Sequence, residues 1–377
     1  MDSMSSSMQP DSEHESGCEH PTGDCCDAGS SGPCAESACD GPVATGTASP
    51  EAQTKLPRQV QEQVWRAVPA AEERLRSVRF PAAPEKIHRR WDRLVRLLGM
   101  DGVRRMQATH VAVFGLGGVG SYLVEALARS AVGRLTLVDF DDVCVTNLNR
   151  QLQAFPETVG RSKAMLLAER VRAINPEAYV DPVQAFFEVA TAEALLTPRP
   201  DIVVDAIDNV TSKVYLLERC TRSRIPVISV TGAGARLDPS RIRIDDLSRT
   251  RVDPLARVLR KELSRRGIGT DGDAGIPVVF SDEEVLQPEV PEWDLESGFR
   301  CICPHREDSP HACEKRRTIY GTAAFMTAAF GMVAAGWVVR QASGRQNSSR
   351  PDARATQAGQ SAQQNDSEVA PESQQGF

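Results

Sequence analysis

Short apolar segments alternate with helix-competent segments along the middle of the chain, and this alternation predicts an α/β fold. The apolar segments, each of four to eight residues, lie at 111–114, 135–138, 180–187, 202–206 and 225–230. Segments with helical character lie between and after them, at 121–130, 163–174, 190–196 and 212–220. This order favours a Rossmann-like, mainly parallel sheet with helices on both faces, whose ligands bind beyond the carboxyl ends of the strands.

Both ends of the chain differ in composition from this middle part. Residues 1–55 hold ten acidic residues against a single lysine, although the formal net charge of the whole chain is only −7. Residues 342–377 are rich in Gln, Ser, Asn and Ala. Neither end can bury enough apolar surface to offset the entropy of ordering, so we predict two disordered tails. Between them we predict an exposed helical linker at 56–85 and a nucleotide-binding domain at 86–341, with a variable, loop-like insertion at 268–316.

An uncharged segment at 321–339 precedes the C-terminal tail. A helix that spans a membrane needs about twenty apolar residues. This segment has nineteen residues, which include three glycines and two threonines, so it is only moderately apolar. A core helix that covers the sheet is the favoured interpretation, and contact with a membrane is the alternative.

Cysteine usage and the acidic tail bear on metal binding and localisation. Cys301, Cys303 and Cys313 lie near two histidines, but Cys-x-Cys lacks the two-residue spacer of common zinc sites. A metal site there is therefore the less favoured alternative to a plain loop. The sequence shows no secretory signal, and its tail is acidic where a transit peptide is basic. We expect a protein of the cytoplasm, or one attached to the mitochondrial outer membrane.

The first apolar segment runs directly into a glycine-rich turn, Gly115-Leu116-Gly117-Gly118-Val119-Gly120, and the second ends at Asp139. In such a unit Gly115 permits a tight turn, while Gly117 and Gly118 let the backbone approach a phosphate at a helix N-terminus. Asp139 can accept hydrogen bonds from ribose hydroxyls. Taken alone, this motif fits a nicotinamide dehydrogenase equally well.

The residues beyond Asp139 favour a different chemistry. Asp141, Asn147, Arg150 and Lys163 place carboxylate, amide, guanidinium and ammonium groups just after the ribose-binding acid. An enzyme that cuts a nucleoside triphosphate at its α-phosphate needs fixed cations for the charge on the departing pyrophosphate. A dehydrogenase does not. The strand at 202–206 then leads to Asp208 and Asn209, and Asp208 supplies a carboxylate that suits Mg²⁺.

A second basic segment, at 241–267, stands out from the acidic chain as a whole. It holds nine Arg or Lys residues against four Asp or Glu residues. Such a surface fits a polyanionic substrate. A helix whose charges are simply solvated is the alternative, with equal weight.

These motifs resemble the ubiquitin-activating-type adenylyltransferase superfamily, and within it the tRNA threonylcarbamoyladenosine dehydratase branch. The resemblance covers about 90–339 without 268–316. The matching motifs are Val113-Phe114-Gly115-Leu116-Gly117-Gly118-Val119-Gly120-Ser121, Asp141-Asp142-Val143-Cys144-Val145-Thr146-Asn147, Asn149-Arg150-Gln151, Asp205-Ala206-Ile207-Asp208, Thr231-Gly232-Ala233-Gly234, Asp253-Pro254-Leu255-Ala256 and Phe330-Gly331. The acidic tail and the cysteine-bearing insertion depart from the family pattern.

The resemblance implies ATP-dependent loss of water from N6-threonylcarbamoyladenosine next to the anticodon of tRNA. ATP would adenylate the threonyl carboxylate, and a nitrogen of the same modification would then displace AMP and close a ring. The resemblance implies that Arg150, Lys163, Asp208 and Arg93 are the catalytic residues. Arg93 would reach the triphosphate from a partner subunit of a homodimer. Asp208 would position Mg²⁺, and Asn209 would lie behind it.

The remaining nucleotide contacts would come from residues around the glycine turn and the loop beyond it. They are Gly115, Gly117, Gly118, Asp139, Asp141 and Asn147. Asp141, like Asp205, is equally interpreted as a structural hydrogen-bonding residue. The alternative enzyme would adenylate the C-terminus of a ubiquitin-like or sulfur-carrier protein, and the alternative non-enzyme would bind nucleotide as a scaffold. The intact set of Asn, Arg, Lys and Asp argues against the scaffold.

Overall fold

The computed structural model describes residues 68–269, 272–295, 302 and 318–345, all of which fall in the larger of the chain's two units, Thr54–Phe377. The predicted acidic tail, the first part of the predicted linker, Cys301, Cys303, Cys313 and residues 346–377 lie outside the described residues.

A seven-stranded sheet in the order β3-β2-β1-β4-β5-β7-β6 runs through the structure. Its strands are β1 (His110–Phe114), β2 (Arg134–Val138), β3 (Tyr179–Val183), β4 (Ile202–Asp205), β5 (Val227–Val230), β6 (Ile242–Asp246) and β7 (Pro277–Ser281). Every pair of neighbours is parallel except β6 and β7, which pair in antiparallel register at one edge. The mainly parallel sheet is therefore confirmed.

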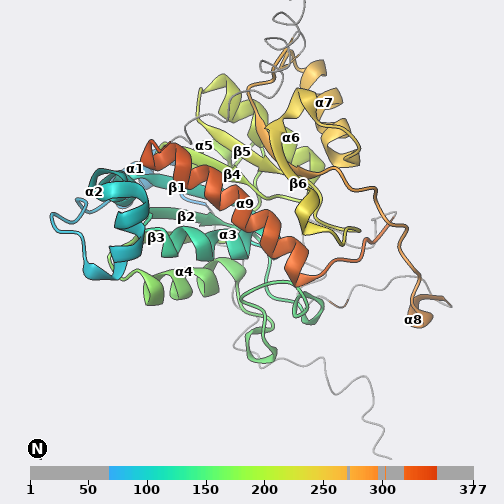
Figure 1. Cartoon of the computed structure of the whole chain (residues 1–377), viewed down its shortest axis with the longest axis horizontal. Helices are drawn as coiled ribbons and strands as arrows, with labels where there is room; N and C mark the ends of the chain where they lie inside the picture. Colours follow the sequence, from blue (N-terminus) through green and yellow to red (C-terminus); the bar gives the residue numbers. More distant parts are fainter. Residues whose placement is uncertain (1–67, 270–271, 296–301, 303–317, 346–377) are drawn as a thin grey trace, which may run out of the picture. The chain divides into compact units, whose positions relative to one another are not determined.

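Helices cover both faces of this sheet, as the alternating pattern predicts (Figure 1). One face packs against α2 (Asp92–Ala108), α3 (Gly118–Arg129), α4 (Lys163–Ile174) and α9 (Ala324–Ser343). The opposite face packs against α5 (Ala192–Leu195), α6 (Val210–Arg222) and α7 (Pro254–Arg265). Two short helices, α1 (Ala71–Ser77) and α8 (Glu292–Leu295), complete the described elements.

The uncharged segment at 321–339 forms most of α9, which lies across α3 and the sheet (Figure 1). Its Met326, Phe330 and Ala334 are fully buried in the core. A Cβ on Gly331 would come within 2.6 Å of the Val119 carbonyl oxygen, so this glycine sets the close approach of α9 to α3. The core-helix interpretation is confirmed. Among the described residues, no helix combines the length and apolar character that crossing a membrane requires.

The predicted loop-like insertion at 268–316 is wrong in its first part. Residues Pro277–Ser281 form β7, which pairs with β5 on one side and β6 on the other. Ile276, Val278 and Val279 are fully buried. The glycines and prolines on either side of this short apolar run hide a strand that belongs to the core.

The predicted exposed helical linker is met only in part where it is described, because it holds one short helix and that helix has a buried arginine. Of residues 68–85, only α1 is helical, and its Arg74 is 4% exposed. The Arg74 guanidinium forms an ion pair of 2.6 Å with Asp181 of β3 and donates to the Thr197 carbonyl oxygen at 2.9 Å. The sequence pattern predicts that an arginine at this spacing is solvated. Its burial could not be predicted, because its partners lie more than a hundred residues away in sequence.

A buried histidine at the start of β1 makes stability depend on pH. His110 is 3% exposed, and burial lowers its pKa from 6.5 to about 4. The unfolded chain therefore binds a proton that the folded chain excludes, and stability is lost as the pH falls from 6.5 toward 4. We expect His110→Gln to remove roughly 2 kcal/mol of the loss that the natural chain shows between about pH 7.5 and about pH 5.

Urea unfolding of the natural chain and of His110→Gln at the two pH values measures this difference. All other titrating groups contribute equally to the two proteins, so their effect cancels in the comparison. Equal pH dependence in the two would contradict the assignment.

Candidate active site

The candidate site lies at the carboxyl edge of the sheet, where the strand order reverses. β1 pairs with β2 on one side and β4 on the other, both in parallel, so the chain leaves these strands at one edge. Gly115 follows β1, Asp139 follows β2 and Asp208 lies three residues beyond β4. The carboxyl edge at such a switch point is where doubly wound sheets bind ligands. The structure thus brings these three predicted residues to one part of the carboxyl edge, which is called the crevice below.

The glycines of the turn after β1 are required for different steric reasons. Gly115 has φ +89°, and a Cβ there would lie 2.5 Å from the Ala206 carbonyl oxygen. A Cβ on Gly120 would lie 1.9 Å from the Gly115 carbonyl oxygen. Gly117 precedes α3 without a side-chain cap, which leaves the N-terminus of α3 suited to a bound anion.

Gly118 has a role that the sequence pattern does not reveal. A Cβ there would lie 2.9 Å from the Thr327 side chain of α9 and 3.2 Å from the Arg150 carbonyl oxygen. Thr327 donates a hydrogen bond to that same carbonyl oxygen at 3.2 Å. Gly118 therefore makes room for α9 and for the loop that carries Arg150, in addition to any approach of a phosphate.

Asp139 ties the glycine turn to the loop that follows β2. One carboxylate oxygen accepts the Leu116 N–H at 2.6 Å and the other accepts the Asp141 N–H at 2.8 Å. Burial raises the pKa of Asp139 to about 6, although the Lys163 ammonium opposes this shift. A carboxylate oxygen accepts more than one hydrogen bond, so these contacts are compatible with the predicted role toward a ribose.

Lys163 is the central cation of the site. Its side chain is 6% exposed, and its Nζ lies 2.8 Å from the Asp141 carboxylate. Burial alone would lower the pKa of Lys163, but Asp139, Asp141 and Asp208 outweigh it and raise the pKa above its ordinary value. Lys163 is therefore charged. The same interactions place three predicted site carboxylates around one ammonium, and they give Asp141 a structural partner.

The loop between β2 and α4 carries the other two predicted phosphate ligands. Asn147 is 7% exposed, and its side-chain oxygen accepts the Cys144 N–H at 3.0 Å. The Arg150 guanidinium donates to the Thr146 carbonyl oxygen at 2.5 Å and to the Asn149 side chain at 3.0 Å.

A residue of this loop that the sequence interpretation missed joins it to the glycine turn. The buried Gln153 side chain donates to the Leu116 carbonyl oxygen at 2.8 Å. The sequence carries no signal for this contact, because an isolated glutamine predicts an exposed position.

A buried ion pair supports the loop that carries Asp208. Asp205 and Lys213 are both fully buried, and Lys213 Nζ lies 2.9 Å from the Asp205 carboxylate. Lys213 also donates to the Ile207 carbonyl oxygen at 3.0 Å, and Ser229 donates to Asp205 at 2.7 Å. Asp205 therefore has a structural role, while Lys213 is a second residue that the sequence interpretation missed.

The predicted neighbour of Asp208, Asn209, has a local structural task. Its side-chain oxygen accepts the Ser212 N–H at 3.0 Å and so caps α6. Asp208 itself is exposed at the end of this loop. Within the described residues, no group of three or more His, Cys, Asp or Glu side chains is arranged to hold a metal ion by itself.

Arg93 is a predicted site residue that this chain does not bring to the crevice. It is exposed on the first turn of α2. The neighbouring Arg90 forms an ion pair of 3.1 Å with Glu177, two residues before β3 begins. The start of α2 is therefore held near the amino edge of the sheet, opposite the glycine turn.

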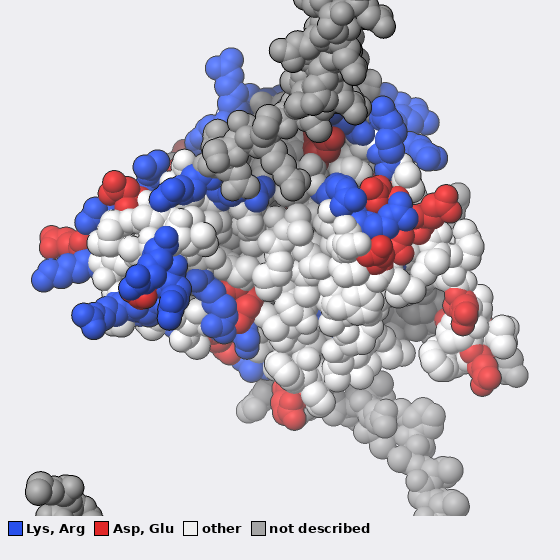
Figure 2. Space-filling model, viewed as in Figure 1, with Lys and Arg blue, Asp and Glu red and all other residues white. Residues whose placement is uncertain are grey.

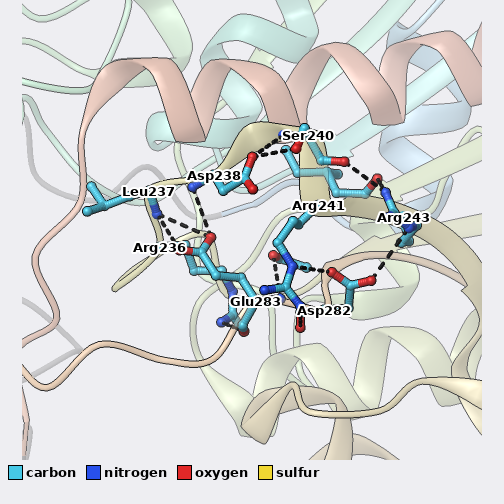
Figure 3. A network of polar contacts seen from close by, with 10 residues as sticks. Arg236, Leu237, Asp238, Ser240, Arg241, Arg243, Asp282 and Glu283 are labelled. Atoms are coloured by element: carbon cyan, nitrogen blue, oxygen red, sulfur yellow. Dashed lines mark hydrogen bonds and ion pairs between the residues drawn. The ribbon is translucent and has the colours of Figure 1, made fainter.

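The basic segment at 241–267 divides into structural and exposed parts. Figure 3 shows Arg241, just before β6, paired with Asp282, just after the antiparallel β7, and Arg236 beside Glu283. Arg236 also forms a buried ion pair of 3.1 Å with Asp253, which caps α7 by accepting the Ala256 N–H at 2.8 Å. The motif Asp253-Pro254-Leu255-Ala256 thus starts a helix and anchors it to the sheet.

The comparison with protein families agrees with the fold and the site. The fold is an α/β fold with an uncapped helix after a glycine turn, and the site holds a lysine among three carboxylates at the switch point. The model of the ThiF family matches residues 91–375, and the chain belongs to this family. The family that the motifs resembled is thereby confirmed.

Particular relatives within this family are tRNA threonylcarbamoyladenosine dehydratases. The protein from Escherichia coli (strain K12) is 39% identical over 242 residues, which cover 63% of this chain and 88% of the relative. The protein from Haemophilus influenzae is 38% identical over 258 residues, which cover 68% of this chain and 94% of the relative. A solved structure of the E. coli dehydratase TcdA in complex with ATP aligns with a TM-score of 0.59 at 35% identity, and covers 70% of this chain and 97% of TcdA.

Proposed function

We propose that the chain catalyses ATP-dependent dehydration, by ring closure, of N6-threonylcarbamoyladenosine next to the anticodon of tRNA. The observation that carries this proposal is the similarity to two dehydratases over 88% and 94% of their lengths. The crevice supports it, because an uncapped helix N-terminus and a buried, charged lysine suit a triphosphate.

The reaction proceeds in two displacements. An oxygen of the threonyl carboxylate attacks the α-phosphorus of ATP, and the bond to the β-phosphate breaks with release of pyrophosphate. A nitrogen of the same modification then attacks the activated carbonyl carbon and loses its proton, while AMP departs with the former carboxylate oxygen. The nucleoside loses one water overall. The second displacement is intramolecular and gains the effective molarity of a tethered nucleophile, so no enzyme nucleophile is needed.

The residues of the crevice divide this work. Lys163 meets the negative charge that develops on the departing pyrophosphate, and Arg150 and Asn147 contact the phosphates. Asp139 accepts hydrogen bonds from the ribose. Asp141 keeps Lys163 in place through the ion pair of 2.8 Å.

The residues of this site fit Mg²⁺, which Asp208 would hold together with phosphate oxygens of the triphosphate. Three carboxylates around one lysine leave the crevice net negative, so a triphosphate needs further positive charge there. Mg²⁺ commonly binds one or two carboxylates together with substrate phosphates, which matches an exposed Asp208 without a ready-made protein cage. When bound, Mg²⁺ neutralises charge on the phosphate oxygens.

Arg93 acts in this proposal from a second copy of the chain. Because the start of α2 lies near the amino edge of the sheet, Arg93 reaches a triphosphate only across a homodimer. A localisation in the cytoplasm, or at the mitochondrial outer membrane, stays a prediction from the composition of the N-terminal tail.

The test is incubation of the full chain with ATP, Mg²⁺ and tRNA that carries the threonylcarbamoyl modification, followed by mass analysis of the nucleosides. We expect the modified nucleoside to lose the mass of one water, with one AMP formed for each event. Unmodified tRNA is the matched control and should give neither product.

An unchanged nucleoside mass would overturn the proposal. Pyrophosphate release stimulated by a ubiquitin-like or sulfur-carrier protein instead of tRNA would establish the alternative enzyme.

A further inference from the structure

A pocket beside α7 lies apart from the crevice described above. It has a volume of about 480 Å³, and its lining includes Ser248, Arg257, Arg260, Lys261, Ser264 and Gly272. Residues 257, 260, 261 and 264 follow one another at the spacing of a single helix face. The adjoining side of α7 buries Ala256, Leu259 and Leu263 in the core, and Leu263 also contributes to the lining of the pocket.

The cations of this pocket lack carboxylate partners within the described residues. Arg257 and Lys261 are exposed and make no side-chain ion pair or hydrogen bond there. Arg260 donates to the Thr250 hydroxyl and to the carbonyl oxygens of Thr250 and Leu247, at 3.1 Å and 3.4 Å. These acceptors carry no charge, so among the described residues no ion pair neutralises the positive charge of the pocket.

The neighbouring arginines behave differently. Arg249 pairs with Asp273, Arg265 pairs with Glu262 at 2.7 Å, and Arg266 pairs with Glu218 at 2.6 Å. Among the described cations of α7, those without an ion pair, Arg257, Arg260 and Lys261, therefore lie on one face, and Arg251 just before the helix also has no ion pair. Figure 2 shows Lys and Arg side chains gathered beside α7, at the upper right.

The pocket also places like charges close together. Burial lowers the pKa of Arg260, and repulsion from Arg251 and Arg257 lowers it further, while the Asp253 carboxylate opposes the shift without reversing it. An arginine stays protonated under these conditions, so the repulsion persists in the free protein. An anion bound among these side chains would relieve it.

We propose that the α7 pocket binds the phosphodiester backbone of the tRNA, through Arg257, Arg260 and Lys261, outside the crevice that holds the reacting adenosine. Two serine hydroxyls and the Arg and Lys side chains supply the donors that phosphate oxygens accept. The inference rests on the proposed function, because it assigns a second contact to the same substrate.

α7 connects the two edges of the sheet. Asp253, which caps α7, accepts a hydrogen bond of 3.0 Å from Thr231 directly after β5. The helix therefore starts beside the carboxyl edge of the sheet, where the crevice lies. The pocket lies toward the opposite edge, because Leu247 and Ser248, which line it, follow the end of β6, and β6 ends beside Pro277 at the start of the antiparallel β7. The proposed tRNA must therefore reach from one edge of the sheet to the other along α7.

The test compares two double variants of the full chain. Arg257→Ala/Lys261→Ala removes unpaired cations of the pocket, while Arg265→Ala/Arg266→Ala removes two paired arginines of the same region and changes the net charge equally. We expect the pocket variant to raise KM for modified tRNA on the order of tenfold with kcat and KM for ATP unchanged. For binding of unmodified tRNA, the slope of log affinity against log salt should fall by about 2.

The control variant should keep the natural slope and KM. Equal slopes and KM values in the pocket variant and the natural chain would overturn this inference while leaving the proposed function intact. Weaker binding of free AMP without weaker binding of tRNA would likewise overturn it, in favour of a mononucleotide site. The binding measurement uses unmodified tRNA and does not depend on dehydration. The inference about the pocket can therefore be tested even if the proposed function fails.

Discussion

Lys163→Ala is expected to lower kcat for ATP-dependent dehydration by about 10² to 10³-fold. The buried Lys163 ammonium is the cation that lies among Asp139, Asp141 and Asp208. Without it, the pyrophosphate that leaves ATP develops its charge beside three carboxylates. The measurement is pyrophosphate release at saturating ATP and modified tRNA, with an expected change in kcat that exceeds any change in KM.

Arg161→Ala is the matched control for this variant. Arg161 lies two residues before Lys163 and pairs with Glu169 at 2.9 Å, but its side chain is 50% exposed. Removing it should leave kcat within about twofold, because surface ion pairs contribute little. Thermal unfolding of both variants shows whether the fold is kept. A folded Lys163→Ala protein with the natural kcat would contradict the assigned role.

The position of the predicted residues at the carboxyl edge of the sheet could be predicted from sequence, because these residues follow recognisable strands. Apolar runs end at Gly115, Asp139 and Asp205, and parallel strands place such ends at one edge of the sheet. The short spacing from Asp139 to Lys163 covers one loop, so the lysine also stays near. Local pattern and sheet topology together were sufficient for these residues.

The supporting contacts could not be predicted, because each one joins segments that are distant in sequence. Gly118 makes room for Thr327, more than two hundred positions away in the chain. β7 is recognisable only once β5 and β6 are seen on either side of it. A lysine such as Lys213 predicts an exposed position from its type alone, and its burial follows from a carboxylate on the neighbouring strand.

Lys213→Ala is expected to lower the free energy of unfolding by about 3 to 5 kcal/mol. The substitution leaves the Asp205 carboxylate fully buried without its cation, and a charge in that position is costly. Burial already raises the pKa of Asp205, and loss of Lys213 raises it further. The folded variant then binds a proton more readily than the unfolded chain, so its deficit in stability should shrink as the pH falls from about 8 toward about 5.

Urea unfolding across this pH range measures the effect, and two further variants interpret it. Arg96→Ala removes an exposed pair with Asp92 of 3.0 Å and should leave the free energy of unfolding almost unchanged, because surface ion pairs contribute little. Asp205→Asn/Lys213→Met should recover most of the stability, because the amide keeps an acceptor for Ser229 and no buried charge is left. A loss in Lys213→Ala that does not depend on pH, or that the double variant does not recover, would show that Lys213 stabilises by packing and not by pairing. The loop that carries Asp208 is held by these same atoms, so in the recovered double variant any remaining rise in KM for ATP reports the lost hydrogen bond from Lys213 to the Ile207 carbonyl oxygen.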